Sequence, residues 1–168
     1  NPKFGVICPS ISSCTNGKYS YTTQGVNAGR CESIREWDCA ATTNVGTYKR
    51  SDDCTISGGN EVAVSNTLEI IGSNTDMNDL VTITAATNYR HFYVTGTLTL
   101  RYIKLTGGEP PPSWNGGAIY INNGDSVNLF FCIVSGNKVA KRGGAIYSDA
   151  SRSEININNR KPLYINDG

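Results

Sequence analysis

A pattern that occurs twice between residues 97 and 147 constrains the fold more than any other feature of this chain. Each copy contains four apolar residues, a glycine-containing turn and the block GGAIY. The apolar residues are Leu98, Leu100, Ile103 and Leu105 in the first copy, and Val127, Leu129, Cys132 and Val134 in the second. Position 98 of the first copy corresponds to position 127 of the second, and the GGAIY block that begins at position 116 recurs at position 143. A period of this length predicts stacked units that bury their apolar residues against one another.

The repeated units predict β-strands, because their apolar runs are short, alternate with polar residues and end at Gly, Asn or Asp. Strands joined by such brief turns cannot form hairpins within a unit and still place Leu98 over Val127, whereas parallel stacking of successive units can. We therefore expect an all-β chain, with a parallel β-solenoid of about four coils over residues 59–168. The expected inward ladders are Leu98 with Val127 and Ile155, and Leu100 with Leu129 and Ile157.

The two GGAIY blocks and the segment CIVSGNKVAKRGGAIY, residues 132–147, resemble the repeats of right-handed parallel β-helix proteins of the pectate-lyase-like superfamily. They are most similar to the GGAI and FxxN repeats of bacterial polymorphic outer-membrane and autotransporter passenger proteins, and to extracellular β-helix proteins of algae and oomycetes. The resemblance covers residues 58–168 and implies a right-handed parallel β-helix. It implies little about activity, since this fold carries lyases, hydrolases, adhesins and structural shafts.

The charge balance of the chain argues against two classes of partner. The net charge is +1, from 15 basic and 14 acidic residues, and the basic residues form no stripe. We therefore expect neither nucleic acid nor an anionic membrane surface as a partner. No apolar run approaches the roughly 18 residues of a transmembrane helix, so we also expect no membrane insertion.

Five of the six cysteines lie in the N-terminal third of the chain, at Cys8, Cys14, Cys31, Cys39 and Cys54. Cysteine-dense, apolar-poor segments are typical of disulfide-stabilised extracellular proteins, so we expect a secreted or cell-surface location. Residues 1–58 are interpreted as a disulfide-stapled cap, with Trp37 and Ile34 packing against the solenoid end, or as an arm that engages a neighbouring subunit. The cysteine spacings do not match paired metal ligands, which argues against a metal site.

The sixth cysteine, Cys132, occupies the ladder position of Ile103 in the preceding unit. We expect it in the core, where a thiol behaves as a small apolar group. The other five cysteines would then form two disulfides and leave one odd thiol, which pairs between chains or with Cys132. The connectivity stays open, because spacing alone does not determine it.

The sequence offers no convergent set of catalytic residues. The acidic residues of the expected solenoid loops are explained by turn geometry: Asp76, Asp79, Asp125, Asp149 and Asp167. His91 is the only histidine, and since it alternates with Phe92 we expect it to point outward as a surface residue. We therefore expect no enzyme activity, no cofactor and no metal.

A carbohydrate-binding or polysaccharide-cleaving module is the alternative hypothesis, with glycans as the partner. Enzymes that share the fold act on polysaccharides, and sugars stack on exposed aromatic rings. Four tyrosines project from expected strands: Tyr93, Tyr102, Tyr120 and Tyr147. The tyrosines of the two GGAIY blocks fall on one ladder, so they are interpreted as residues that stabilise the stack.

The segment EPPPSW, residues 109–114, forms a longer loop than its counterpart at residues 137–142. It contains Pro110, Pro111, Pro112, Ser113 and Trp114. Consecutive prolines are stiff and extended, so we expect a protruding loop with an exposed aromatic ring. Three interpretations stay open: a simple loop, a contact point and an O-glycosylation site.

The last expected coil has no helix, proline cluster or charged strand that would cover it. Its apolar residues are Ile155, Ile157, Leu163 and Ile165. An uncovered end exposes apolar side chains and unpaired backbone groups, so we expect head-to-tail self-association through this edge. The leading hypothesis is a non-enzymatic extracellular structural protein, either a subunit of a surface filament or shaft, or part of an adhesin stalk.

Overall fold

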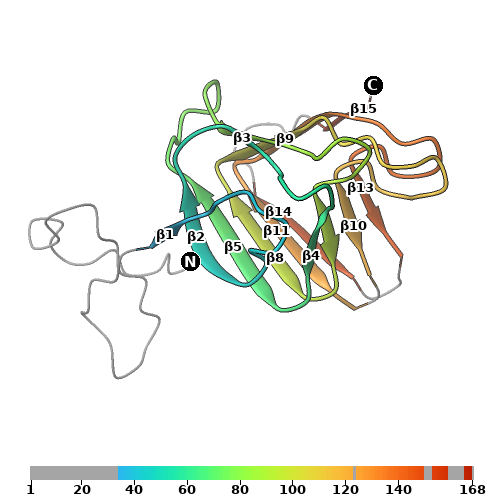
Figure 1. The fold of residues 1–168 in the computed structure, drawn as a ribbon, viewed down its shortest axis with the longest axis horizontal. Helices are drawn as coiled ribbons and strands as arrows, with labels where there is room; N and C mark the ends of the chain where they lie inside the picture. The colour runs from blue at the N-terminus through green and yellow to red at the C-terminus, as the bar shows by residue number, and fades with distance from the viewer. Residues whose placement is uncertain (1–33, 123, 150–152, 159–164, 168) are drawn as a thin grey trace, which may run out of the picture. The chain divides into compact units, whose positions relative to one another are not determined.

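The chain folds as a parallel β-solenoid, which confirms the predicted fold class. The computed structural model describes residues 34–122, 124–149, 153–158 and 165–167, the last range by its backbone only. Every regular element within these ranges is a β-strand, and the ladders among β2 to β15 run parallel. Figure 1 shows the strands of successive coils following one another along the solenoid, with the colour passing from blue to orange.

The strands form three sheets. The six-stranded sheet contains β1 (Arg35–Glu36), β2 (Gly46–Arg50), β5 (Thr67–Gly72), β8 (Thr97–Arg101), β11 (Ser126–Phe130) and β14 (Glu154–Asn158). The five-stranded sheet contains β3 (Cys54–Thr55), β6 (Val81–Thr84), β9 (Ile103–Thr106), β12 (Ile133–Asn137) and β15 (Ile165–Asp167). The four-stranded sheet contains β4 (Val62–Val64), β7 (Phe92–Val94), β10 (Ile119–Ile121) and β13 (Ile146–Ser148).

Each complete coil visits the three sheets in the same order. One coil consists of β5, β6 and β7, and the next consists of β8, β9 and β10. The coil of β2, β3 and β4 precedes them, and the coil of β11, β12 and β13 follows. The four-stranded sheet therefore corresponds to four coils, and β14 and β15 belong to a further, partial coil.

The inward residues of neighbouring coils stack in register, as the repeat predicts. Val127 pairs with Leu98 on one side and with Ile155 on the other, and Leu129 pairs with Leu100 and Ile157 in the same way. Leu98, Leu100, Val127 and Leu129, which lie in complete coils, have no exposed surface. Burying an aliphatic side chain of this size contributes about 1.5–3 kcal/mol, so each of these ladder residues stabilises the stacking of the coils.

The two glycines of each GGAIY block have different roles. Gly116 and Gly143 adopt φ values of +73° and +70°, which an L side chain rarely adopts. Gly117 lies against the backbone carbonyl of Gly144 in the next coil, and a Cβ atom on Gly117 would overlap that oxygen. The first glycine therefore allows the turn, and the second allows two coils to approach each other closely.

The solenoid includes strands on the N-terminal side of residue 58, where the sequence placed the cap or arm. β2 pairs with β5 and β3 pairs with β6. The chain divides into two compact units, Asn1–Arg35 and Glu36–Gly168. Strand β2, with the sequence GTYKR, has no aliphatic alternation, because Tyr48 stands where later coils carry Ile70 and Leu100. Hydrophobic periodicity therefore does not reveal this coil.

Packing against the solenoid core involves Trp37, as the sequence predicts, whereas Ile34, the other residue predicted to pack there, is only partly buried. Trp37 is fully buried, its ring centroid lies 6.3 Å from that of Phe92, and its indole Nε1–H donates a hydrogen bond to the carbonyl of Thr43. A disulfide joins Cys39 and Cys54 in the same region. Cys8, Cys14 and Cys31 lie outside the described residues, so the remaining pairings stay predictions.

Candidate functional site

The outer face of the four-stranded sheet carries a ladder of three tyrosines. Tyr93, Tyr120 and Tyr147 occupy the same position in β7, β10 and β13. The ring centroids of Tyr93 and Tyr120 lie 5.2 Å apart with an interplanar angle of 6°, and those of Tyr120 and Tyr147 lie 5.7 Å apart with an angle of 26°. Each ring therefore stacks on the next, and the ladder holds neighbouring coils together.

Tyr102 does not belong to this ladder. It lies between β8 and β9 in the left-handed backbone region, with φ of 55°, and Phe131 adopts the same φ one coil later. The two rings stack with centroids 5.1 Å apart and planes 5° apart. The four tyrosines considered for sugar stacking thus fall into two places, and all four stack on another ring of the protein.

Arg90 packs against the tyrosine ladder and is almost completely buried. Its guanidinium carbon lies 4.6 Å from the ring centroid of Trp114 and 4.9 Å from that of Tyr120. The guanidinium group donates hydrogen bonds to the carboxylate of Glu61 and, at 2.6 Å, to the backbone carbonyl of Asn115. Internal partners thus occupy this cation, so it is not free to bind an acidic ligand.

The sequence contained a signal for this ion pair that hydrophobic periodicity does not detect. Glu61 and Arg90 are separated by the same interval as Leu98 and Val127 of the inward ladder. Burial raises the pKa of Glu61, while its hydrogen bond and charge interaction with Arg90 lower it. A charge pair at the repeat spacing therefore indicates contact between neighbouring coils.

Asp149, like Arg90, has partners within the protein, which are tyrosines of the ladder. Its carboxylate accepts hydrogen bonds from the hydroxyl groups of Tyr120, at 2.7 Å, and of Tyr147, at 3.5 Å. Burial and the hydrogen bond to Asp149 raise the pKa of Tyr120 to about 12. The phenol consequently remains a donor at neutral pH, and Asp149 is positioned by two tyrosines.

His91 is buried, so the prediction of an outward surface histidine is wrong. The backbone N–H groups of His91 and Phe92 both donate to the carbonyl of Ala118, at 2.9 and 3.1 Å. This shared acceptor interrupts the alternation, and both side chains face inward. The arrangement recurs one coil later, where Ala118 and Ile119 share the carbonyl of Ala145. His91 therefore occupies the position of a buried alanine in the GGAIY blocks.

The environment of His91 does not suit acid–base catalysis. Its Nε2 lies 3.0 Å from the carbonyl oxygen of Ile83, and its ring stacks on Phe92. Burial lowers the pKa of His91 to about 4, although the carbonyls of Ile83 and Thr106 raise it. The imidazole is therefore neutral at pH 7 and has no contact with solvent.

Cys132 lies in the core, as its ladder position predicts. It is fully buried, and its Sγ lies 3.4 Å from the carbonyl oxygens of Leu100 and Phe130. Burial raises the pKa of the Cys132 thiol to about 11. This side chain therefore contributes to packing and is not a nucleophile at neutral pH.

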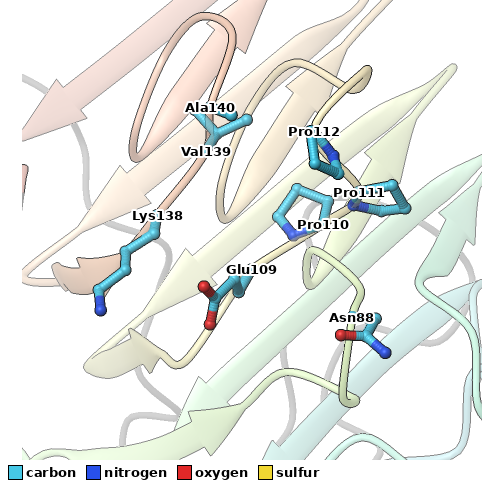
Figure 2. A pocket seen from close by; sticks show the side chains of 8 residues that line it. All are labelled: Asn88, Glu109, Pro110, Pro111, Pro112, Lys138, Val139 and Ala140. Atoms are coloured by element: carbon cyan, nitrogen blue, oxygen red, sulfur yellow. The ribbon is translucent and has the colours of Figure 1, made fainter.

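The proline loop lines a groove on the described part of the solenoid. Figure 2 shows the loop of Pro110, Pro111 and Pro112 opposite the loop that carries Val139 and Ala140. The groove has a volume of about 680 Å³ and is lined by Asn88, Glu109, Pro110, Pro111, Pro112, Lys138, Val139 and Ala140. Its charged groups are one carboxylate and one ammonium, so it shows no strong preference for a ligand charge.

The proline loop is less extended than its sequence suggests, and its aromatic residue is half-buried. The N–H of Trp114 donates to the carbonyl of Pro111 at 2.9 Å, which closes a turn. The Trp114 ring packs edge-on against Tyr89, with centroids 6.0 Å apart, in addition to its contact with Arg90. Pro112 and Ser113 are exposed, whereas Pro110 is buried. The contact and O-glycosylation interpretations of this loop stay predictions.

The C-terminal coil presents the largest departure from the buried pattern. Ile155 and Ile157 are each 41% exposed, whereas their ladder partners Val127 and Leu129 are fully buried. Strand β14 pairs with β11 on one side and is the last strand of the six-stranded sheet. Leu163 lies outside the described residues, and only the backbone of Ile165 is described.

The opposite end of the solenoid is covered by side chains of the same unit. Trp37, Cys39 and Ile56 are buried there in the common core. The side-chain amide of Asn44 donates a hydrogen bond of 2.8 Å to the carbonyl of Ala63, in β4 at the edge of the four-stranded sheet. The two ends of the described solenoid thus differ, since only the C-terminal end exposes its inward ladder.

In the described part of the chain, no three His, Cys, Asp or Glu side chains come together in a way that could hold a metal ion. The same residues include no helix with the length and apolar character needed to cross a membrane.

Residues 131–149 match the family model of the Chlamydia polymorphic membrane protein (Chlamydia_PMP) repeat. The matched stretch contains β12, β13 and the second GGAIY block. The chain matches no curated protein and no solved structure. Together with the parallel ladders, the repeat match shows that this chain is a β-helix that resembles polymorphic membrane and autotransporter passenger proteins, and it indicates a surface-associated protein.

Proposed function

We propose that this chain is a non-enzymatic structural module of the cell surface, a rigid solenoid segment of a filament, shaft or adhesin stalk that self-associates through its C-terminal coil. The observation that carries the proposal is the exposure of Ile155 and Ile157, at 41% each, at the end of ladders that are otherwise buried. Apolar ladders of this kind are normally covered in solenoid proteins, by a cap or by a further coil.

The polar groups of the candidate site support a structural role. Arg90, Asp149 and the tyrosine ladder are occupied by one another, and His91 is buried and neutral. An enzyme of this fold would need carboxylates or a histidine that reach a substrate. The disulfide between Cys39 and Cys54 and the repeat match support an extracellular location.

The carbohydrate alternative has less support. Sugar binding by aromatic stacking needs ring faces that are open to solvent. The faces of Tyr120 are covered by Tyr93 and Tyr147, and Tyr102 stacks on Phe131. Screening the chain on a glycan array would favour the alternative if a specific glycan bound and Tyr147→Ala abolished that binding.

Self-association is tested by sedimentation velocity of the whole chain over a range of concentrations. We expect oligomers that become more abundant with concentration, and we expect the double variant Ile155→Lys, Ile157→Lys to be monomeric. Val45→Lys is the matched control, because Val45 is 51% exposed and directly precedes β2 in the first complete coil. A wild-type chain that stays monomeric at the highest concentration would refute the proposal.

A further inference from the structure

We infer that two copies of the chain associate tail to tail, with β14 of one copy pairing antiparallel with β14 of the second about a two-fold axis at Asn156. This inference rests on the proposed self-association through the C-terminal coil and specifies the geometry of that contact. A two-fold contact joins two copies and does not by itself propagate into a filament. The head-to-tail arrangement expected from the sequence joins two different ends of the solenoid. The tail-to-tail arrangement uses the same end of both copies.

The two ends of the described solenoid differ in whether apolar side chains are open to a second copy. Head-to-tail stacking requires an open apolar end at the N-terminal side of the unit as well as at the C-terminal side. Within the described residues the N-terminal side is covered, because Trp37 packs on Phe92 and Asn44 occupies the carbonyl of Ala63 in β4. The C-terminal side exposes Ile155 and Ile157. A contact that joins two C-terminal ends therefore buries apolar surface on both copies.

The backbone of β14 alternates between groups that face β11 and groups that face the outer edge of the sheet. The N–H of Glu154 donates to the carbonyl of Asp125, so Glu154 directs its backbone groups toward the neighbouring coil. Successive residues of a strand direct these groups to alternate sides. Ile155 and Ile157 therefore direct their N–H and C=O groups to the outer edge of β14. The residues whose backbone groups face this edge are the same residues that have exposed apolar side chains.

The sequence of β14 favours one register for an antiparallel pair. With Asn156 on the two-fold axis, Ile155 lies opposite Ile157 of the second copy, and the two residues exchange backbone hydrogen bonds in both directions. Glu154 lies opposite Asn158 of the second copy, so like charges do not face each other. A shift of two residues would set an isoleucine against Ser153 and leave fewer apolar contacts. The sequence of β14, EININ, is therefore self-complementary in this register.

The test is a disulfide at the two-fold axis. Asn156 lies opposite itself at a position without backbone hydrogen bonds, where Cα atoms are about 4.5 Å apart. This separation falls within the range of disulfides, about 4.4–6.8 Å. We expect Asn156→Cys to give a covalent dimer under mild oxidation, with a 156–156 peptide identified by mass spectrometry after non-reducing digestion.

Asn158→Cys is the matched control, on the same strand and the same face as Asn156. In this register the two copies of residue 158 are displaced along the pair by about 13 Å, so no 158–158 disulfide forms. Adding Ile155→Lys and Ile157→Lys to the Asn156→Cys chain removes the covalent dimer.

The outcomes separate this inference from the proposal on which it rests. Oligomers of the wild-type chain without a 156–156 disulfide in the Asn156→Cys variant would overturn the tail-to-tail geometry and leave self-association standing. A disulfide from residue 156 to Cys8, Cys14 or Cys31 of another copy would overturn it in favour of an N-terminal arm at this edge. A wild-type chain that is monomeric at every concentration would overturn both.

Discussion

The positions of single residues in this molecule are decided by the coil above and the coil below. Gly117 lies against the carbonyl of Gly144, and His91 takes the place that Ala118 and Ala145 take in later coils. In both cases the relevant neighbour is about one repeat away in sequence. Substitutions at such positions therefore change stability through contacts between neighbouring coils.

Replacing Gly117 by alanine should lower the free energy of unfolding by about 3 kcal/mol, because the added Cβ forces two coils apart. Gly117 does not need a positive φ, so this cost is steric. Gly124→Ala is the control, since a Cβ there meets nothing within 4 Å and only the φ of +85° is unfavourable, at about 1–2 kcal/mol. Urea unfolding measures both, and equal costs would contradict the close-approach explanation.

Stability should fall between pH 7 and pH 5 because of His91. The pKa of His91 is lowered to about 4 in the folded chain, against 6.5 for an exposed histidine, so the unfolded chain binds a proton first as the pH falls. The contribution of neutral His91 to the free energy of unfolding is therefore fully present above about pH 6.5 and is lost toward pH 4. The free energy of unfolding should fall by about 2 kcal/mol between pH 7 and pH 5.

Urea unfolding at several pH values measures this effect. His91 is the only histidine, so no other histidine contributes to the slope. The variant His91→Leu places an apolar, non-titrating side chain in the core, so its free energy of unfolding should change little over the same pH range. A slope that persists in His91→Leu would assign the effect to carboxylates instead.

At the scale of the strands, two Glu–Arg pairs connect neighbouring coils in different environments. Glu61 and Arg90 have 16% and 6% of their side chains exposed, whereas Glu69 and Arg101 have 24% and 35% exposed. Arg90 also packs between Trp114 and the tyrosine ladder, and Arg101 packs on Phe130 at 4.0 Å. The two pairs have the same chemistry, so comparing their contributions to stability separates the effect of burial from the effect of charge.

Glu61→Gln should destabilise the chain by about 3 kcal/mol, because it leaves the buried guanidinium of Arg90 without a counter-charge. Glu69→Gln should cost less than about 1 kcal/mol, because water solvates Arg101. Thermal or urea unfolding of the two variants gives the comparison. If both substitutions lower the free energy of unfolding equally, burial of the Glu61–Arg90 pair does not increase its contribution to stability.

At the scale of the whole molecule, the described part of the chain is a short stack of coils in which each coil contacts its neighbours. Such arrays gain stability from every interface between coils, so an end coil with one neighbour is less stable than an inner coil with two. The coil of β8, β9 and β10 has neighbours on both sides, whereas β14 pairs with β11 alone among the described strands. Local stability should therefore decrease toward β14.

Hydrogen exchange followed by mass spectrometry measures this gradient. In dilute protein, peptides covering residues 97–106 should exchange slowly and peptides covering residues 153–158 should exchange faster than those of the inner coils. Raising the protein concentration should slow exchange in residues 153–158 specifically, because self-association covers β14. Protection of β14 that does not depend on concentration would contradict an association surface at this edge.

The sequence alone determined the stacking of the coils. The repeat offset places Leu98, Val127 and Ile155 in one ladder, and a slip by a single position would turn the inward residues outward, so the repeat specifies both fold and register. The same logic placed Cys132 in the core. These predictions succeeded because they depend on a period, which a linear sequence records directly.

The tertiary structure alone decided the features that depend on departures from that period. His91 faces inward because two backbone amides share the carbonyl of Ala118. The alternation of apolar and polar residues in the sequence does not predict such a shared acceptor. Trp114 covers Arg90, although these residues lie in different coils. The pairing of Cys39 with Cys54 also depends on three-dimensional proximity, because cysteine spacing alone leaves the connectivity open. Spacing constrains which residues share a ladder, but only the folded backbone determines which side chains from irregular turns meet.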